Sequence, residues 1–170
     1  MDLKDTLNEA LKGRLKRFGS NIIQTKEECK YFPKDTDELT KTINKRVKKD
    51  PECDLNDVWV GDITDMRYLF AETNFNGDIS RWDVSNVKDM TGVFHKCHFN
   101  GDISRWDVRN VESMCAMFKN SAFNEDISSW NVSNVKDTRE MFYNCPFESD
   151  ISSWDVSSVK NMSHMFSKSK

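Results

Sequence analysis

The sequence predicts an α/β solenoid, a leucine-rich-repeat-like right-handed coil in which each repeat adds one short strand and one short helix. The stretch FNGDISRWDVSNVKDMTGVFHKC begins at Phe75 and returns in register at Phe99, Phe123 and Phe147, a step of 24 residues each time. The tryptophans follow the same step: Trp82, Trp106, Trp130 and Trp154. A fixed period of this length is typical of proteins in which one small unit stacks on its neighbours.

Within each repeat the hydrophobic period changes, which predicts the two kinds of element. Trp82 and Val84 alternate with polar residues, as in a strand. The next apolar residues have the spacing i, i+3, i+6 and i+7 of one helical face: Val87, Met90, Val93 and Phe94. Asn86 is placed to cap that helix. We expect the tryptophans to form one ladder through the core and four phenylalanines to form another: Phe94, Phe118, Phe142 and Phe166.

The repeat register divides the chain into three parts. A degenerate first repeat places Leu55 on Ile79 and Phe70 on Phe94. The solenoid therefore covers residues 51–170 in five units: 51–74, 75–98, 99–122, 123–146 and 147–170. Residues 35–50 predict an N-terminal capping helix that starts near Asp35 and buries a stripe of Leu39, Ile43 and Val47.

Residues 1–34 predict an amphipathic helical leader followed by a linker. Leucines recur every four residues in its first part: Leu3, Leu7, Leu11 and Leu15. Such a helix packs on the solenoid or a partner, lies on a membrane surface, or becomes ordered only on assembly. The acidic residues of its polar face disfavour the membrane. The sequence leaves open whether this helix is an anchor or part of the cap.

Composition and charge limit the location and the partners. The 170 residues have a net charge of −3, so there is no strong nucleic-acid signal. There is no apolar run long enough to span a bilayer and no secretory signal. The five cysteines are an odd number, which favours reduced thiols. These features predict a cytoplasmic protein, with a virion or the cell surface as the alternative.

The residues that could carry chemistry do not form a catalytic set. One column of aspartates suggests a Ca²⁺ ladder, but we favour aspartates that accept backbone N–H groups in turns: Asp78, Asp102, Asp126 and Asp150. His95, Cys97 and His98 lack the further ligands that zinc needs. No nucleotide-binding loop is present. We therefore expect no enzyme, no metal and no cofactor.

The repeat string FNGDISRWDVSNVKDM…F resembles the BspA-like leucine-rich-repeat family known from mycoplasmas as a domain of unknown function. The stretch YFPKDTDELTKTI…DLNDVWVGDITDMRYLF resembles the leader that precedes such repeats. The resemblance implies a solenoid used for binding, without catalysis. The family's usual location is the cell surface, yet this chain lacks a signal peptide or lipoprotein cysteine. Its opening, MDLKDTLNEAL, resembles short leaders on proteins of large phages, which implies a virion-associated role.

Two places in the repeats are candidates for partner binding. One is a lateral edge where the repeats vary and carry arginine: Arg81, Arg105 and Arg109. The alternative for this edge is a solvated or ion-paired face.

The other place is the last unit, which keeps the interior residue types although no residues follow to cover them: Trp154, Met165 and Phe166. Its end stacks on another molecule, frays, or marks a chain cut from a longer protein. The sequence thus predicts a non-enzymatic interaction or structural module that binds a protein partner, or itself, through the lateral face or the open C-terminal end. The alternative is a surface adhesin or a virion component within a larger assembly.

Overall fold

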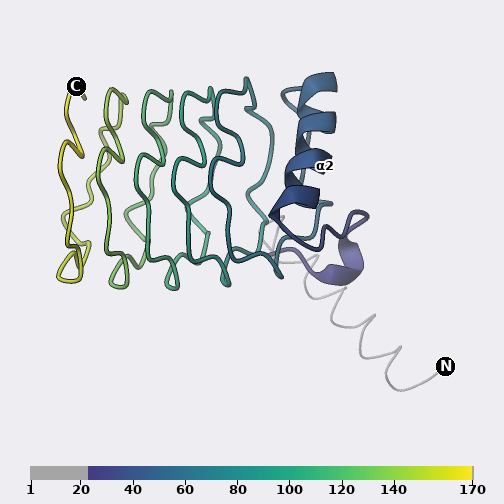
Figure 1. The fold of residues 1–170 in the computed structure, drawn as a ribbon, viewed down its shortest axis with the longest axis horizontal. Coiled ribbons are helices and arrows are strands. Elements are labelled where there is room, and N and C mark those ends of the chain that lie inside the picture. The colour runs from purple at the N-terminus through teal and green to yellow at the C-terminus, as the bar shows by residue number, and fades with distance from the viewer. Residues whose placement is uncertain (1–22, 170) are drawn as a thin grey trace, which may run out of the picture.

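A computed structural model describes residues 23–169 of the chain. These residues contain a 3-10 helix, η1 (Lys26–Glu28), and one α-helix, α2 (Thr36–Lys49). Beyond α2 the backbone runs in successive loops that lie side by side, with α2 at one end and the C-terminal unit at the other (Figure 1). The amphipathic helix predicted in the first part of residues 1–34, over residues 1–20, lies outside the described residues.

The fold class that the sequence predicts, an α/β solenoid of strands and helices, is wrong. Between residues 50 and 169 the structure has no helix and no strand. The β-type pairing between neighbouring units in this range is limited to isolated parallel bridges between residues 24 apart, such as Asp65 to Asp89 and Ser113 to Asp137. The units are therefore built from turns. The division of the chain into domains stays a prediction.

Left-handed backbone explains why the predicted helix of each unit does not form. Gly92 has φ of 63° and Lys96 has φ of 53°, whereas an α-helix needs negative φ throughout. Each unit instead makes overlapping i to i+3 turns, in which the amides of Val93 and His95 donate to the carbonyls of Met90 and Gly92. Turns repeated at this spacing place the apolar side chains inward just as a helical face would.

The predicted strand is also a turn, and its tryptophan joins neighbouring units. The amide of Trp82 donates to the Ile79 carbonyl at 3.2 Å, which closes the turn. Its indole Nε1 donates to the Leu55 carbonyl of the preceding unit at 2.9 Å. Three later tryptophans repeat this bond at 3.0 to 3.2 Å: Trp106, Trp130 and Trp154. Asn86 caps no helix, because its Nδ2 donates to the carbonyl of Gly61.

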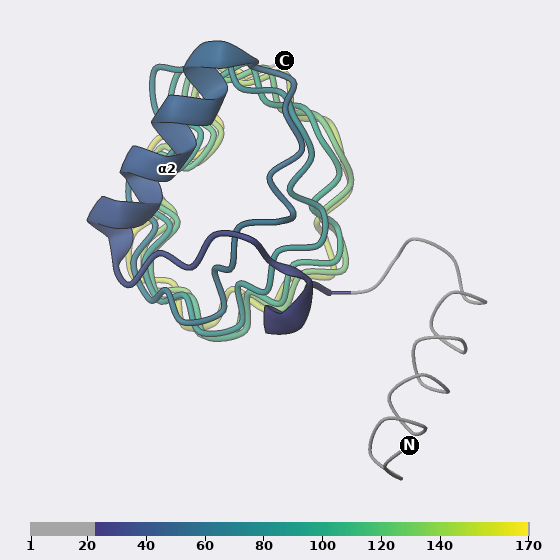
Figure 2. The same ribbon diagram turned by 90° about the vertical axis from the view of Figure 1, so that its right-hand side faces the viewer.

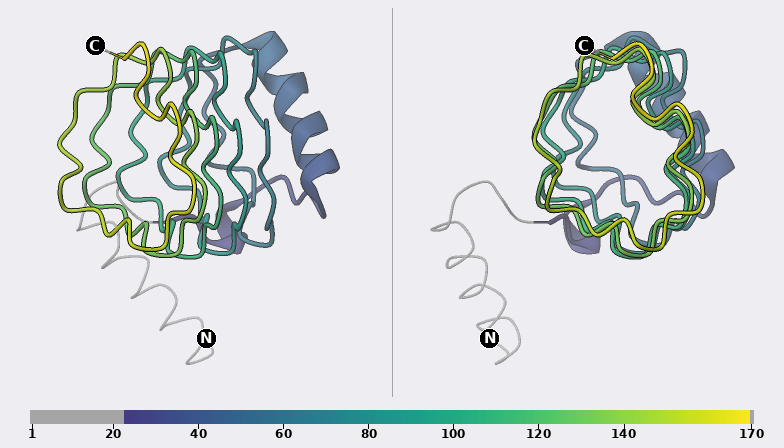
Figure 3. Two further views of the ribbon diagram at one scale, coloured as in Figure 1. Left: turned by 60° about the vertical axis from the view of Figure 1, so that its left-hand side comes forward. Right: turned by 90° about the vertical axis from the view of Figure 1, so that its left-hand side faces the viewer.

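The core is a stack of aromatic rings that runs through all the units. The predicted phenylalanine ladder is confirmed: Phe94, Phe118, Phe142 and Phe166 stack with centroids 5.5 to 5.6 Å apart. A second ladder starts at Phe75 and follows the 24-residue step at 5.8 to 6.3 Å. In the end-on views the units share one outline (Figure 2 and Figure 3, right).

α2 covers the N-terminal end of this core. The helix begins after Asp35, whose side chain accepts the Glu38 amide at 2.9 Å, as the sequence indicates. Its apolar face buries Leu39, Ile43 and Val47 in the same core as the rings of the units. The helix lies across one end of the loops (Figure 2).

Candidate interaction surface at the C-terminal end

Backbone hydrogen bonds between neighbouring units point in one direction along one turn segment, whereas the residue just before that segment donates to the preceding unit, as Glu112 does to the Lys88 carbonyl. Along the turn segment of each unit, the amide of every second residue donates to a carbonyl of the next unit. The Phe94 amide donates to Met117, that of Phe118 to Met141, and that of Phe142 to Met165, all at 2.9 Å. Unit 123–146 makes four such bonds to the last unit, at 2.9 to 3.0 Å, from Thr138, Glu140, Phe142 and Asn144. This segment therefore presents donors forward and acceptors backward.

Within residues 23–169 nothing lies in front of this donor row in the last unit. The carbonyls of its segment are occupied by unit 123–146. Within residues 23–169 the matching amides donate to no acceptor: Met162, His164, Phe166 and Lys168. An unpaired backbone donor row is a ready template for another chain.

The apolar side chains of the last unit are also more exposed than their counterparts in the preceding unit. Val156 is 41% exposed, whereas Val132, one unit earlier, is 2% exposed. Phe166 is 49% exposed, whereas Phe142 is fully buried. Met162 is also 49% exposed. These three side chains and the four amides form a surface that we name the C-terminal end face, which is turned toward the viewer in Figure 3, right.

The structure places the three predicted residues of this end differently. Phe166 lies in the C-terminal end face. Trp154 and Met165 are 8% and 9% exposed, because unit 123–146 covers them, so they offer little surface. The predicted partner-binding set did not include Val156 and Met162, although both are interior residue types of the repeat. Val156 continues a column of buried valines, and Met162 continues a buried column of Met66, Met90, Met114 and Thr138.

The three arginines of the lateral edge are engaged within the chain. Arg81 Nη2 forms an ion pair with Glu28 of η1, and Arg109 Nε forms one with Asp107 at 2.8 Å. Arg105 is exposed and also has an interaction within the chain. The three arginines therefore do not form a cationic patch whose charges lack interactions within the chain. Their role in partner binding stays a prediction.

Aspartates in the repeated turns bind backbone amides, which agrees with the interpretation that we favoured over Ca²⁺. Asp102 Oδ1 accepts the amide of Ser104 at 2.9 Å and its hydroxyl at 2.7 Å. The same bonds from Ser128 and Ser152 lower the pKa of Asp126 and Asp150. Among residues 23–169 no three acidic, histidine or cysteine side chains form a group that could hold a metal ion.

The histidine and cysteine cluster belongs to the packing of its unit. The Cys97 thiol donates to the Phe75 carbonyl at 3.4 Å, and burial raises its pKa. Burial lowers the pKa of His95, whose Nδ1 has no hydrogen-bond partner among the described residues. All five cysteines are free thiols.

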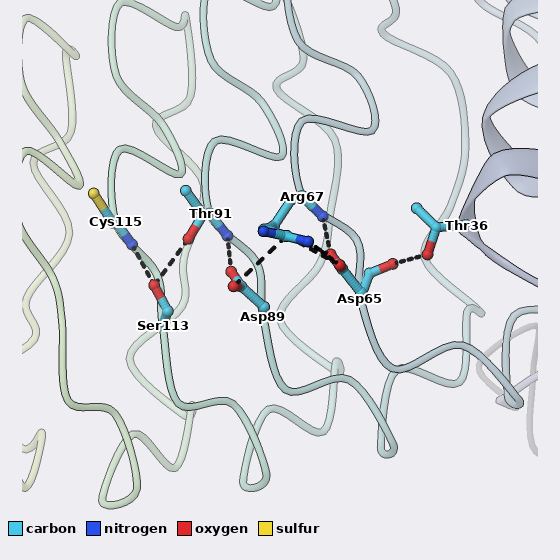
Figure 4. A network of polar contacts seen from close by, with 7 residues as sticks. All are labelled: Thr36, Asp65, Arg67, Asp89, Thr91, Ser113 and Cys115. Carbon is cyan, nitrogen blue, oxygen red and sulfur yellow. Dashed lines mark hydrogen bonds and ion pairs between the residues drawn. The ribbon is translucent and has the colours of Figure 1, made fainter.

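A polar network ties α2 to the first two units (Figure 4). Thr36, the first residue of α2, donates its hydroxyl to the Asp65 carbonyl at 2.6 Å. The guanidinium of Arg67 donates to both carboxylate oxygens of Asp65 and lies 3.8 Å from Asp89, so it bridges neighbouring units. This arrangement lowers the pKa of Asp65, chiefly through the hydrogen bonds from Arg67. The contacts are structural, and they belong to the covered end of the molecule.

A shallow lateral cleft of about 400 Å³ spans several units. Three asparagines line it, and each donates its side-chain amide to a carbonyl of the unit before: Asn86, Asn110 and Asn134. Lys136 and Glu112, also in the lining, form an ion pair. These groups bind one another, so the cleft has fewer unsatisfied groups than the C-terminal end face.

The geometry defines a protein of tandem 24-residue units whose rings and backbone amides continue from one unit to the next. The family model described as a Mycoplasma protein of unknown function, DUF285, matches residues 38–146 and 64–170, so the chain belongs to this family. No curated protein and no solved structure matches the chain. Among the described residues no helix has the length and apolar character needed to cross a membrane.

Proposed function

We propose that this chain is a non-enzymatic interaction module that binds another protein through the C-terminal end face. One observation carries the proposal: Val156 and Phe166 are exposed, although their counterparts in the preceding unit are almost fully buried. Burying a large apolar side chain completely contributes about 1.5–3 kcal/mol. Phe166 is still 49% exposed and Val156 is 41% exposed, so part of this free energy remains to be gained. A partner that covers these side chains gains that free energy.

The resemblance of the repeats to BspA-like leucine-rich-repeat proteins supports a binding role and gives no reason to expect catalysis. The cytoplasmic location remains a prediction. The adhesin or virion role rests on sequence resemblance alone.

A photo-crosslinking experiment tests the proposal. A photoreactive amino acid replaces Met162, the chain is irradiated in an extract of its source cells, and adducts are separated by mass. We expect one discrete protein adduct that Phe166→Glu abolishes. Phe32→Glu is the matched control, because Phe32 is 51% exposed and Phe166 is 49% exposed. An adduct that both substitutions reduce equally, or no adduct, contradicts the proposal.

A further inference from the structure

The direction of the backbone hydrogen bonds restricts what can cover the C-terminal end face. Each forward amide in an interior unit donates to a carbonyl, as in Tyr68 to Thr91 and Phe70 to Val93, both at 2.9 Å. The last unit repeats this segment with the same left-handed residues, since φ is 58° at His164 and 61° at Lys168. Its four open amides therefore continue an interface that is already formed four times in the molecule. Their partner must supply carbonyl oxygens at every second residue.

A second copy of this chain does not supply that row. Two C-terminal end faces brought together would set amide donors opposite amide donors, which leaves both rows unpaired. The opposite end of a copy is occupied by α2, whose Leu39 and Ile43 are fully buried in the core. The C-terminal end of a copy thus offers donors to the donor row, and α2 covers its other end.

We propose that the C-terminal end face binds an extended segment of a partner protein by backbone pairing. Carbonyl oxygens of that segment accept the amides of Met162, His164, Phe166 and Lys168. This inference rests on the proposed function and adds the class of partner. The partner is a chain with a run of unpaired backbone carbonyl groups, and that run pairs with the last unit as the next unit of the stack would.

The side chains of the end face add a requirement for the segment. Phe142 and Phe166 stack with centroids 5.5 Å apart and planes 8° apart, so the outer face of Phe166 is parallel to the place that the next ring would occupy. An aromatic or large aliphatic residue of the segment fits there. The Lys160 carbonyl accepts no bond within the described residues, whereas its counterpart Lys136 accepts the Lys160 amide at 2.8 Å. One amide of the segment therefore pairs beside the row of carbonyls.

The probe for this proposal is a peptide taken from the chain itself. Residues 87–96, VKDMTGVFHK, present four carbonyls to the amides of the unit before, at 2.8 to 2.9 Å: Asp89, Thr91, Val93 and His95. A matched control peptide has ester bonds in place of the amide bonds that follow Thr91 and Val93. The esters keep every side chain and weaken two of the acceptors.

The readout is residue-specific hydrogen exchange of the isotope-labelled full chain, followed by NMR with about 1 mM unlabelled peptide, a concentration suited to weak binding. We expect exchange to slow about tenfold or more at Met162, His164, Phe166 and Lys168. The amides of Met165 and Ser167 already donate within turns, so their exchange should not change. The ester peptide should bind about tenfold more weakly, as expected when two acceptors are impaired.

Substitutions in the C-terminal end face, and the possible negative results, distinguish this inference from the proposed function. Phe166→Glu and Met162→Glu should each abolish the slowed exchange, and Phe32→Glu should not. If the photo-crosslink forms but the alternating protection is missing, or if the ester peptide binds equally well, backbone pairing is overturned while the proposed function stands. If sedimentation shows a dimer in which these four amides are protected without peptide, a second copy is the occupant and the inference is wrong.

Discussion

The two ends of the stack are finished in different ways. At the N-terminal end, α2 buries Leu39 and Ile43 completely, and Thr36 donates to a backbone carbonyl of the first unit. At the C-terminal end, Phe166 and Met162 are each about half exposed at 49%, and a row of amides has no acceptor among the described residues. The difference supports the proposal that the repeat is a scaffold and that the partner binds at the end whose interface is left open among the described residues.

The largest effect that this comparison predicts concerns the phenylalanine ladder. Phe94 is fully buried between Phe70 and Phe118, with ring centroids 5.5 and 5.6 Å away. Phe94→Ala should reduce the free energy of unfolding by about 3–5 kcal/mol, because it leaves a cavity in the core. Phe166→Ala should cost roughly 1 kcal/mol, because the ring is half exposed. Urea unfolding measures both, and equal losses would contradict the contrast.

The second effect compares the apolar side chains that close each end. Ile43→Ala in α2 should cost about 2–4 kcal/mol, because Ile43 is fully buried. Val156→Ala should cost less than about 1 kcal/mol, because Val156 is 41% exposed. Thermal unfolding followed by circular dichroism checks this pair. A loss at Val156 as large as that at Ile43 would mean that the C-terminal end is already covered.

The register of the fold was predictable from the sequence, but the elements within each unit were not. Side chains such as Phe94 and Phe118 recur every 24 residues, so their stacking follows from repetition alone. The turns that replace the predicted helix need left-handed backbone, and four of the five positions aligned with Gly92 are not glycine: Tyr68, Ala116, Glu140 and His164. Sequence preference gives no signal for left-handed backbone at such residues.

The candidate site was predictable in part for a similar reason. The apolar residue types of the last unit follow from the register. Phe166 is 49% exposed there, and its role in partner binding stays a prediction. Trp154 and Met165 were expected at the open end, but unit 123–146 buries them. The donor row could not be predicted, because it depends on the orientation of the backbone amides. The side-chain types in the sequence do not indicate that orientation.

The third predicted effect on stability concerns a column of asparagines on the surface. Asn100 Oδ1 accepts the Asn124 amide of the next unit at 2.7 Å, so Asn100→Ala should cost about 1 kcal/mol. Glu148 has the equivalent position in the last unit, where no further unit donates to it within the described residues. Glu148→Ala should leave the urea midpoint almost unchanged. A shift as large as that of Asn100→Ala would count against the comparison.

The smallest effect is a pH dependence that belongs to an interior unit. Burial, with the nearby charges of Lys96 and Lys119, lowers the pKa of His95 below its ordinary value of 6.5, and Glu72 and Glu140 oppose the shift. Folding therefore favours the neutral ring. The stability that this contributes is complete above pH 6.5 and is lost as the pH falls through the lower, folded pKa.

His95→Gln removes this titration, so its unfolding midpoint should decline less than that of the original chain between pH 7 and pH 5. Chemical unfolding at several pH values measures the two slopes. If the variant declines as steeply as the original chain, His95 is not the group responsible.

Hydrogen exchange of the isolated chain tests the central claim most directly, by comparing the same four positions in the last two units. The amides of Thr138, Glu140, Phe142 and Asn144 donate to the next unit and should be strongly protected. Those of Met162, His164, Phe166 and Lys168 should exchange at rates close to those of an unstructured chain. Equal protection of the two sets in the monomeric protein would contradict the claim that the C-terminal end face is open.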